Sequence, residues 1–325
     1  MIELRIWRTR IEAAAERLER QVVRTVLRRA DRLSARLGAP VFLKLENRQT
    51  TGSFKLRGAA NAVALLGEAA RARGLITASS GNHGRALAYA ARAAGAGCTV
   101  FVSPLVPRHK LDALAREGAE VRVVGGSQDE AEAAARATAE TEGRSFVPPF
   151  DDPDVIAGQG TVGEEIVDQL CEVELVLVPL SGGGLAAGVA AAVKSRRPEI
   201  RVIGVSMARG AAMHASLKAG HPVEVAEEPT LADALGGGIG QQNRYTFEMA
   251  RALLDDAVLL SEGEIADGIR AAAAEGEVAE GAGAIGLGAL LAGKVSLRGA
   301  AVALISGGNI DPALHRRILA GETVS

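Results

Sequence analysis

Several features that would narrow the function of this 325-residue chain are missing from it. No run of about 18 apolar residues occurs, so nothing in the sequence predicts a membrane-spanning helix. The N-terminal stretch MIELRIWRTRIEAAAERLERQ carries charge throughout, whereas a secretion signal needs an apolar stretch. We therefore expect a cytoplasmic protein without a membrane partner.

Cysteine and net charge are also scarce. The two cysteines, Cys98 and Cys171, lie far apart and have no second Cys or His at metal-ligand spacing, so we interpret both as buried free thiols. The formal net charge is −2, which does not favour nucleic acid as a partner. Small-molecule chemistry is the remaining default.

What the chain does have is an alternation of short β-like runs with alanine-rich segments of helical period, which is typical of an α/β protein with parallel sheets. The expected strands lie in PVFLKLE, GLITAS, CTVFVSP, AEVRVVG, VELVLVPL, RVIGVS, AVLLS and AVALIS. The expected helices cover about 6–20, 82–95, 108–117, 127–142, 159–170 and 184–194, with further helices around 229–253 and within 262–293. The prolines and aspartates of SFVPPFDDPD predict a linker between two such series.

Three loops that follow strands are candidates for a ligand site, because open parallel sheets bind ligands at the carboxyl ends of their strands. They are ASSGNHG after the strand that ends near Ala78, PLSGGGLAAG after the strand that ends near Leu180, and LISGGNID after the strand that ends near Ile305. Each joins small or hydroxyl residues to glycine.

The second of these loops suits a phosphate. Gly182, Gly183 and Gly184 follow a buried strand and open a helix, so bare N–H groups and the helix N-terminus would hold an anion. GGGLAA also satisfies a dinucleotide fingerprint, but the acidic residue expected at the end of the next strand is replaced by Ser206 and Met207. A glycine turn without a ligand is the other alternative. The P-loop-like GALLAGKV ends a helix and is discarded.

A lysine in the run QTTGSFKLRGAAN needs an explanation, since a helix N-terminus is a poor place for a cation. Lys55 could be a solvated lysine behind a Ser53 cap. A buried lysine, however, loses its charge and forms Schiff bases with carbonyls. A phosphate cradle plus such a lysine is what pyridoxal phosphate requires, and Ser306 is placed to meet the ring nitrogen.

Histidine gives little support to a catalytic interpretation. His83 has no carboxylate at a neighbouring helical position to orient it, so a solvated or packing role in a helix-start turn is favoured. The other four histidines are interpreted as structural or solvated; they are His109, His214, His221 and His315.

The chain resembles the type II fold pyridoxal-phosphate enzymes, which include threonine and serine dehydratases and serine racemase. The resemblance covers roughly 40–312, and its motifs occur in the order of the family: KLENRQTTGSFKLRGA, SSGNHG, PPFDDPDVIAGQGT, PLSGGGLAAG, PTLADALGGGIG, EGAGA and LISGGNID. SMARGAAMHASLKAGHPVEV and GGGIGQQNRYTF are most similar to a hydroxyectoine-utilization dehydratase. This likeness implies two open, mostly parallel twisted sheets flanked by helices.

The resemblance also implies a role for each site residue. Lys55 would carry the cofactor as a Schiff base and Ser80 would be a second catalytic group. The cofactor would further contact Phe54, Asn82, Gly182, Gly183, Gly184, Leu185, Glu280 and Ser306, with Asn82 at the phenolic oxygen, the glycine loop at the phosphate and Ser306 at the pyridine nitrogen. The substrate carboxylate would meet Ser79, Ser80, Gly81, Asn82 and His83.

The sequence departs from the family in two places. Ser181 stands where the family has its first loop glycine. Ser206 and Ala212 stand where the racemase-like branch has two metal-binding carboxylates, so we expect no metal. The end of the chain at Ser325 leaves no room for the regulatory domain of the biosynthetic dehydratases, which we therefore do not expect.

By resemblance, a large cofactor-binding domain would comprise 1–46 and 150–325, and a small mobile domain 47–149. The implied reaction is β-elimination from a 3-hydroxy amino acid such as L-threonine, L-serine or a hydroxyectoine-derived amino acid, which gives a 2-oxo acid and ammonia. The alternatives are an amino acid racemase that uses Lys55 and Ser80, and a non-catalytic nucleotide-binding or regulatory protein. The habit of the family predicts a homodimer.

Overall fold

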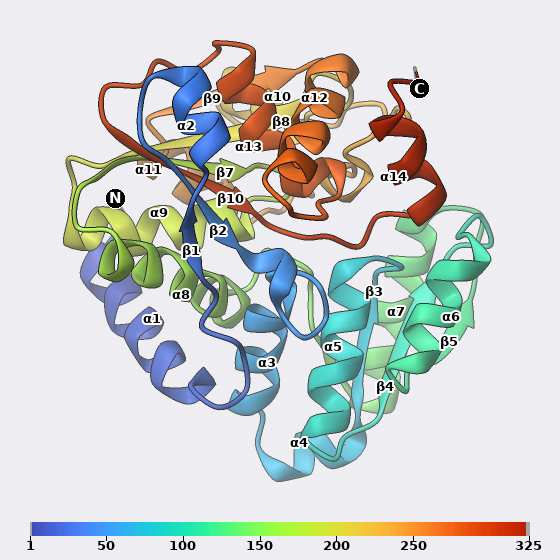
Figure 1. The fold of residues 1–325 in the computed structure, drawn as a ribbon. Coiled ribbons are helices and arrows are strands. Elements are labelled where there is room, and N and C mark those ends of the chain that lie inside the picture. Colours follow the sequence, from blue (N-terminus) through green and yellow to red (C-terminus); the bar gives the residue numbers. More distant parts are fainter. Residues whose placement is uncertain (1, 323–325) are drawn as a thin grey trace.

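The computed structural model describes residues 2–322 and contains two β-sheets with helices on both faces of each (Figure 1). The large sheet has the order β1-β2-β10-β7-β8-β9. Its strands are β1 (Leu27–Arg29), β2 (Val41–Leu45), β7 (Val173–Pro179), β8 (Arg201–Met207), β9 (Asp256–Leu260) and β10 (Ala300–Ile305). Only β1 is antiparallel to its neighbour, so the sheet is mostly parallel.

The small sheet has the order β5-β4-β3-β6, and all of its strands are parallel. Its strands are β3 (Leu75–Ala78), β4 (Cys98–Val102), β5 (Glu120–Val123) and β6 (Ser145–Phe146). The expected fold class, two mostly parallel sheets flanked by helices, is thereby confirmed. The division into two domains at 46/47 and 149/150, and the mobility of the smaller one, stay predictions.

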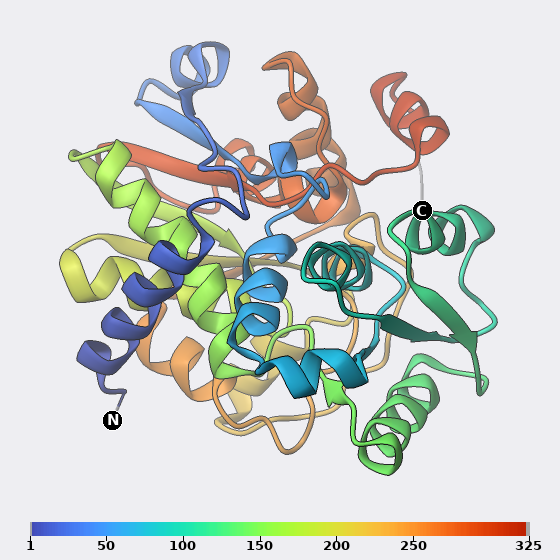
Figure 2. The same cartoon turned by 90° about the horizontal axis from the view of Figure 1, so that it is seen from below.

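The helices connect parallel strands and cover both sheets, as Figure 2 shows from below. Those of the first half are α1 (Leu4–Leu18), α2 (Asp31–Leu37), α3 (Lys55–Leu65), α4 (Glu68–Arg73), α5 (Asn82–Ala93), α6 (Arg108–Arg116) and α7 (Gln128–Glu142), with a short 3-10 turn, η1 (Glu46–Arg48). Those of the second half are α8 (Pro153–Gln169), α9 (Gly184–Arg196), α10 (Ala212–Ala219), α11 (Thr246–Leu253), α12 (Glu262–Ala274), α13 (Gly281–Leu291) and α14 (Pro312–Leu319), with η2 (Asp233–Leu235).

The core follows from the apolar runs in the sequence. Every residue of β10 is buried, as expected for an inner parallel strand with helices on both faces. One apolar cluster joins the large sheet to α1, α8, α9 and α11, and a second joins it to α12 and α13 on the opposite face. The helix α3 packs against both α8 and α5, so it connects the surroundings of the two sheets. No helix among residues 2–322 is long and apolar enough to cross a membrane.

Several local predictions were wrong. The helix expected from 159 begins at Pro153, because the Asp152 carboxylate accepts hydrogen bonds from the N–H groups of Asp154 and Val155 and so caps it. The region 229–253 contains only η2 and α11, and α10, α14 and β1 were not predicted. Cys98 is buried, but Cys171 is exposed, since it lies in the turn between α8 and β7 and not within either element.

Candidate active site

Of the three candidate loops, the one at 79–81 follows a strand of the small sheet, and those at 181–184 and 306–309 follow strands of the large sheet. The strands β7 and β10 are neighbours in the large sheet and parallel, so their carboxyl ends, and the loops at 181–184 and 306–309, lie at the same edge. The loop at 79–81 follows β3 of the small sheet and opens α5. The side chain of Asn82, the first residue of α5, connects this loop to the others.

Asn82 lies between two polar side chains of the second half of the chain. Its Nδ2 donates to Glu280 Oε1 at 2.7 Å, and its Oδ1 accepts from Asn309 Nδ2 at 2.6 Å. Burial raises the pKa of Glu280 to about 7, and the charge of Asp233 acts in the same direction. Two of the expected cofactor contacts, Asn82 and Glu280, are thus brought into direct contact with each other.

Lys55 is the first residue of α3, and its amine lies in a largely apolar place. Its Nζ donates to the carbonyl oxygen of Pro149 at 2.6 Å and lies 5.3 Å from the centre of the Phe54 ring. Burial lowers the pKa of Lys55 to about 8. Neither the Pro149 carbonyl nor the Phe54 ring carries a charge that would hold the proton, so a large fraction of this amine is neutral near pH 8 and available as a nucleophile.

A second buried lysine makes a useful contrast. Lys44 has no exposed surface, and it donates to Glu165, to Gln169 Oε1 and to the carbonyl oxygen of Thr25. All three donors of its ammonium are therefore engaged, one by a carboxylate. Lys55 is the better candidate for covalent chemistry, because its acceptor among residues 2–322 is a neutral carbonyl.

The collar before Lys55, residues 51–54, pairs with the loop after β10. Ser53 and Gly307 form an isolated antiparallel bridge, and the N–H of Phe54 donates to the carbonyl oxygen of Ser306 at 3.0 Å. Gly52 has φ +78°, and a Cβ there would overlap the side chain of Asn309. Close backbone pairing thus accounts for the small residues before Lys55.

The glycine loop leads directly into α9. Gly183 has φ +91° and stands at the N-cap, where no side chain caps the helix. The hydrogen bond from Ala187 N–H to the Gly183 carbonyl is the first of the helix, so N–H groups of the first turn have no acceptor among residues 2–322. The side chain of Leu185 packs into the core, so only its backbone can face a ligand.

The segment 147–152 was interpreted as a linker, but it lines the site. The Pro149 carbonyl accepts from Lys55, and Phe150 packs so closely that a Cβ on Gly182 would overlap its ring. Further along, the Asp151 carboxylate accepts hydrogen bonds from the N–H groups of residues 244–246. The only sequence signal for this role is the PPFDD run itself, since backbone carbonyls leave no signature.

His83 is buried, contrary to a solvated interpretation. Its Nε2 lies 3.1 Å from the Val147 carbonyl oxygen, which can only accept, so Nε2 carries the hydrogen. Burial, together with the nearby Lys55, lowers the pKa of His83 to about 3. Its Nδ1 has no partner among the described residues. Ser79, Ser80 and Gly81 are partly buried in the turn before α5.

Ser306 directly follows β10 and is 3% exposed. Its hydroxyl makes no hydrogen bond with any residue in the described part of the chain, although its carbonyl accepts from Phe54. The hydroxyls of Thr51 and Ser53 in the collar are buried and also lack partners. Unpaired buried hydroxyls indicate groups that a ligand would satisfy.

These donors fit pyridoxal 5′-phosphate. The uncapped first turn of α9 suits its phosphate, the Lys55 amine suits its aldehyde, and the unpaired hydroxyl of Ser306 suits its ring nitrogen. In the part of the chain that the structure describes, no three His, Cys, Asp or Glu side chains gather as a metal site would require. Ser206, at the expected metal position, is buried and its hydroxyl faces the sulfur of Met207 at 3.4 Å.

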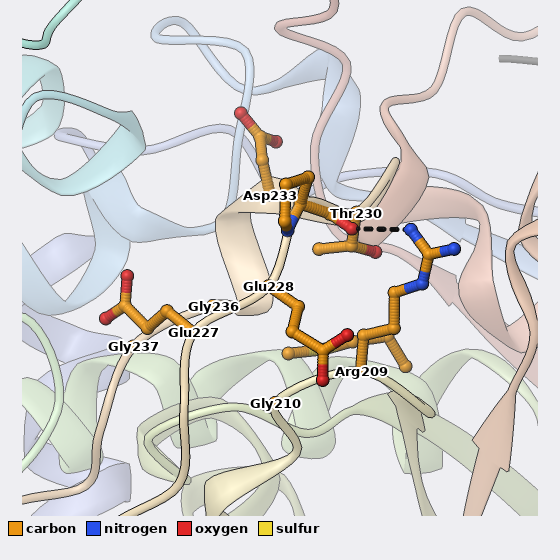
Figure 3. A pocket seen from close by; sticks show the side chains of 10 residues that line it. Arg209, Gly210, Glu227, Glu228, Thr230, Asp233, Gly236 and Gly237 are labelled. Atoms are coloured by element: carbon orange, nitrogen blue, oxygen red, sulfur yellow. Dashed lines mark hydrogen bonds between the residues drawn. The ribbon is translucent and has the colours of Figure 1, made fainter. Parts of the chain in front are cut away.

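A cavity of about 260 Å³ lies beyond the carboxyl end of β8 (Figure 3). Figure 3 shows Arg209 on one side of it and Glu227, Glu228 and Asp233 around it, and Arg209 donates to the Pro229 carbonyl at 2.9 Å. The cavity wall comes near Glu280, because the charge of its lining residue Asp233 helps to raise the pKa of that carboxyl. Its remaining lining includes Met207, Gly210, Gly236 and Gly237.

Comparison with known proteins gives consistent matches. The family described as pyridoxal-phosphate dependent enzymes matches residues 18–307. A Sinorhizobium fredii protein, named only provisionally as a threonine dehydratase, is 57% identical over 96% of this chain and 94% of its own length. The L-threonine ammonia-lyase of Thermotoga maritima is 43% identical over 95% of this chain and 77% of its own length. The structure of maize serine racemase superposes with a TM-score of 0.90 at 29% identity, over 97% of both chains.

Proposed function

The chain belongs to the family of pyridoxal-phosphate dependent enzymes, and from that premise we propose that it is a lyase that removes water from a 3-hydroxy amino acid. The products are a 2-oxo acid and ammonia. The observation that carries this proposal is Lys55, whose partly buried amine donates to a neutral carbonyl and to no carboxylate in the described part of the chain. Pyridoxal phosphate is the cofactor, and when bound it supplies an aldehyde for amines and a ring that takes up an electron pair from the α-carbon.

Residues of four segments would hold the cofactor. The backbone N–H groups of Gly182, Gly183, Gly184 and Leu185 would bind the phosphate at the start of α9. Ser306 would meet the ring nitrogen, Asn82 the phenolic oxygen, and Phe54 and Glu280 would lie beside the ring. A neutral Ser306 does not hold the ring nitrogen protonated, which favours prompt elimination over long-lived carbanion storage.

The loop 79–83 would bind the substrate. The helix α5 begins at Asn82 without a side-chain cap, so N–H groups of its first turn are free to bind the substrate carboxylate. The side chain of His83 is a poor partner for a carboxylate, since its neutral Nδ1 can only accept. We therefore propose that His83 contributes through its backbone, and Ser79, Ser80 and Gly81 through backbone or hydroxyl groups.

Proton transfer is proposed for Lys55. Its neutral amine takes the proton from the substrate α-carbon, and the electron pair left behind expels the β-hydroxyl, which leaves as water after it gains a proton. The enamine that is released hydrolyses to the 2-oxo acid and ammonia. Lys55 Nζ is thus the atom that holds the proton between the two steps.

Dehydration is favoured over racemisation by the relatives. The protein with 43% identity is named for threonine cleavage, whereas the racemase structure is 29% identical. Racemisation would need Ser80 as a second acid or base opposite Lys55. The experiment below distinguishes racemisation from dehydration. A non-catalytic nucleotide-binding protein is the least supported alternative. Such a protein needs a carboxylate for the ribose at the end of this strand, and β8 ends with Ser206 and Met207.

For the substrate side chain we propose a 3-hydroxy amino acid larger than serine, with hydroxyectoine-derived amino acids as the leading candidates. Two segments carry the likeness to the hydroxyectoine branch, and both line the cavity of Figure 3, through Met207, Arg209 and Gly210 and through Gly236 and Gly237. We also propose a cytoplasmic location and, from the habit of the family, a homodimer. Sedimentation of the purified protein would test the homodimer.

The testing experiment measures 2-oxo acid release from L-threonine, L-serine, 3-hydroxyaspartate and hydroxyectoine-derived amino acids, in heavy water. We expect release from at least one L-substrate, with little deuterated D-isomer in the unreacted pool. Ser80→Ala is expected to keep most of this release. If deuterated D-isomer accumulates faster than 2-oxo acid, the protein is a racemase and the proposal is wrong.

A further inference from the structure

Four charged side chains with almost no exposed surface lie behind the start of α3. They are Lys44 on β2, Glu46 in η1, Arg57 on α3 and Glu165 on α8, and we call them the buried charge cluster. Lys44, Glu46 and Arg57 are 0% exposed and Glu165 is 8% exposed. Two cations thus balance two carboxylates in a region that is shielded from solvent.

Arg57 is the centre of this cluster. Its Nε and Nη2 donate to the two oxygens of Glu46, both at 2.8 Å, and its Nη1 and Nη2 donate to the two oxygens of Glu165 at 2.7 and 3.0 Å. Nη1 also donates to Thr161 Oγ1 at 3.0 Å, and Nη2 to the Val23 carbonyl at 3.2 Å. Two bidentate pairs fix the plane of the guanidinium, which a lysine ammonium could not do.

The position of Arg57 in α3 connects the cluster to Lys55. With 3.6 residues per turn, side chains two positions apart lie on roughly opposite faces of a helix. Lys55 accordingly reaches Pro149, while Arg57 reaches η1 and α8 on the other side. Both residues belong to the first turn, so a rotation of that turn that displaced one would displace the other.

Backbone contacts and packing already hold the first turns of α3. Phe54 stands at its N-cap, and no side chain caps it. The collar pairs through its backbone with Ser306 and Gly307, and the N–H of Gly58 donates to Gln159 Oε1 at 3.2 Å. To these the two bidentate pairs of Arg57 add side-chain contacts with charged groups of η1 and α8, which fix the orientation of the first turn relative to both elements.

We propose that Arg57 is a positioning residue, which holds α3 between Glu46 and Glu165 and thereby keeps the Lys55 amine beside the Pro149 carbonyl. This rests on the proposed function only in that Lys55 is the reactive amine. The placement of that amine can be measured in the full-length chain without turnover. The positioning role and the proposed function can therefore be refuted independently of each other.

The test is the pH dependence of Lys55 labelling by an amine-selective acylating reagent, measured by peptide mass spectrometry on the full-length chain after removal of cofactor. For the natural sequence we expect a midpoint that reflects the pKa of Lys55 at about 8. In Arg57→Lys the charge stays and the fork is lost, so the amine gains water and the midpoint rises by at least one pH unit, a roughly tenfold loss of labelling rate at pH 7. His83, the titratable neighbour whose pKa senses Lys55, is neutral throughout this range. In the holoenzyme we expect kcat to fall at least tenfold and KM to change less than threefold.

The matched control is Lys44→Met, which removes a buried charge of the same cluster from β2 and leaves both carboxylates of Arg57 in place. It should lower Tm and leave the Lys55 midpoint unchanged. If Arg57→Lys does not fold, Glu165→Gln carries the test, with a smaller shift in the same direction. An unchanged midpoint in whichever of these two variants folds overturns the proposal, as does an equal shift in Lys44→Met. If the labelling midpoints shift as expected but the natural sequence releases no 2-oxo acid, the proposed function is wrong and the positioning role of Arg57 still stands.

Discussion

The amine nitrogen of Lys55 lies 2.6 Å from the carbonyl oxygen of Pro149, a residue 94 positions later in the chain. A carbonyl accepts a hydrogen bond from either an ammonium or a neutral amine, and although the bond from the ammonium is the stronger, the carbonyl offers no negative charge to hold the proton. The site therefore keeps its lysine oriented without fixing it in the charged state. This relationship underlies the first two predictions.

Replacement of Lys55 by alanine should abolish the visible absorption of lysine-bound cofactor and reduce turnover by at least a thousandfold, because the amine serves both functions. Absorption spectra and 2-oxo acid assays measure this. Lys44 is the matched control, since it is buried but fully paired, and the variant Lys44→Met should keep the absorption band. A borohydride-reducible lysine adduct in Lys55→Ala would show that another lysine binds the cofactor.

Burial of the Lys55 amine should also lower the stability of the cofactor-free folded protein. Its pKa is about 8 in the folded protein and 10.5 ordinarily, so between these values the unfolded chain binds the proton more strongly, and stability rises with pH. Below pH 8 the penalty is fully present. Lys55→Met should therefore raise the free energy of unfolding of the cofactor-free protein at pH 7 by about 2 kcal/mol, with allowance for partial exposure. Urea unfolding at pH 7 and pH 10.5 tests this, and a gain of equal size at both pH values would contradict it.

Glu280 has the opposite pH window. Its pKa is raised from 4.5 to about 7, so between these values the folded protein binds the proton more strongly, and stability falls as pH rises. Glu280→Gln keeps an oxygen for Asn82 and should stabilise the protein at pH 8 by up to about 3 kcal/mol, with little effect at pH 4.5. Glu277→Gln is the control, because Glu277 is ion-paired with Arg28 and Arg48 and its loss should destabilise. Destabilisation by Glu280→Gln at pH 8 would refute the assignment.

Gly183 should be needed for cofactor and not only for the turn. Alanine at φ +91° costs about 1 kcal/mol, and its Cβ would lie 2.8 Å from Met213 Cε and 2.9 Å from Thr246 Cβ, which displaces the start of α9. We expect Gly183→Ala to lose most of its bound cofactor on gel filtration. Gly293→Ala has a similar φ of +65° in open space and controls for strain alone. Full occupancy in Gly183→Ala would indicate a purely structural turn.

Exhaustive chelation should leave activity within twofold of the untreated enzyme. Ser206 is buried against Met207 and Ala212 begins α10, so these two positions offer only neutral groups to a divalent ion. Assays before and after EDTA dialysis measure the effect. A large loss that magnesium or calcium restores would place a metal elsewhere in the enzyme.

The sequence was most informative where one residue type determines the geometry. Apolar runs identified β7 and β10, and the glycines shortly after β7 identified the turn that opens α9, because both depend on local chemistry. It was least informative where a contact is made by backbone or by distant charge. The carbonyl of Pro149 has no signature, and Arg57 reads as one polar residue in a helix until Glu165 is brought to it. The 229–253 region failed because η2 and long loops replaced helices that its apolar residues suggested.

The pairing of β10 with both β2 and β7 has a consequence for synthesis on the ribosome. Strand β2 is complete at Leu45, but the strand that separates it from β7 spans Ala300–Ile305. During translation β2 and the inner edge of β7 must therefore wait, unpaired, for almost the whole chain to emerge, and such edges are prone to associate with other nascent chains. The small sheet, whose strands all lie within residues 75–146, can complete its pairing far earlier, so the loop 79–81 can form before the segment after β10 pairs with the collar.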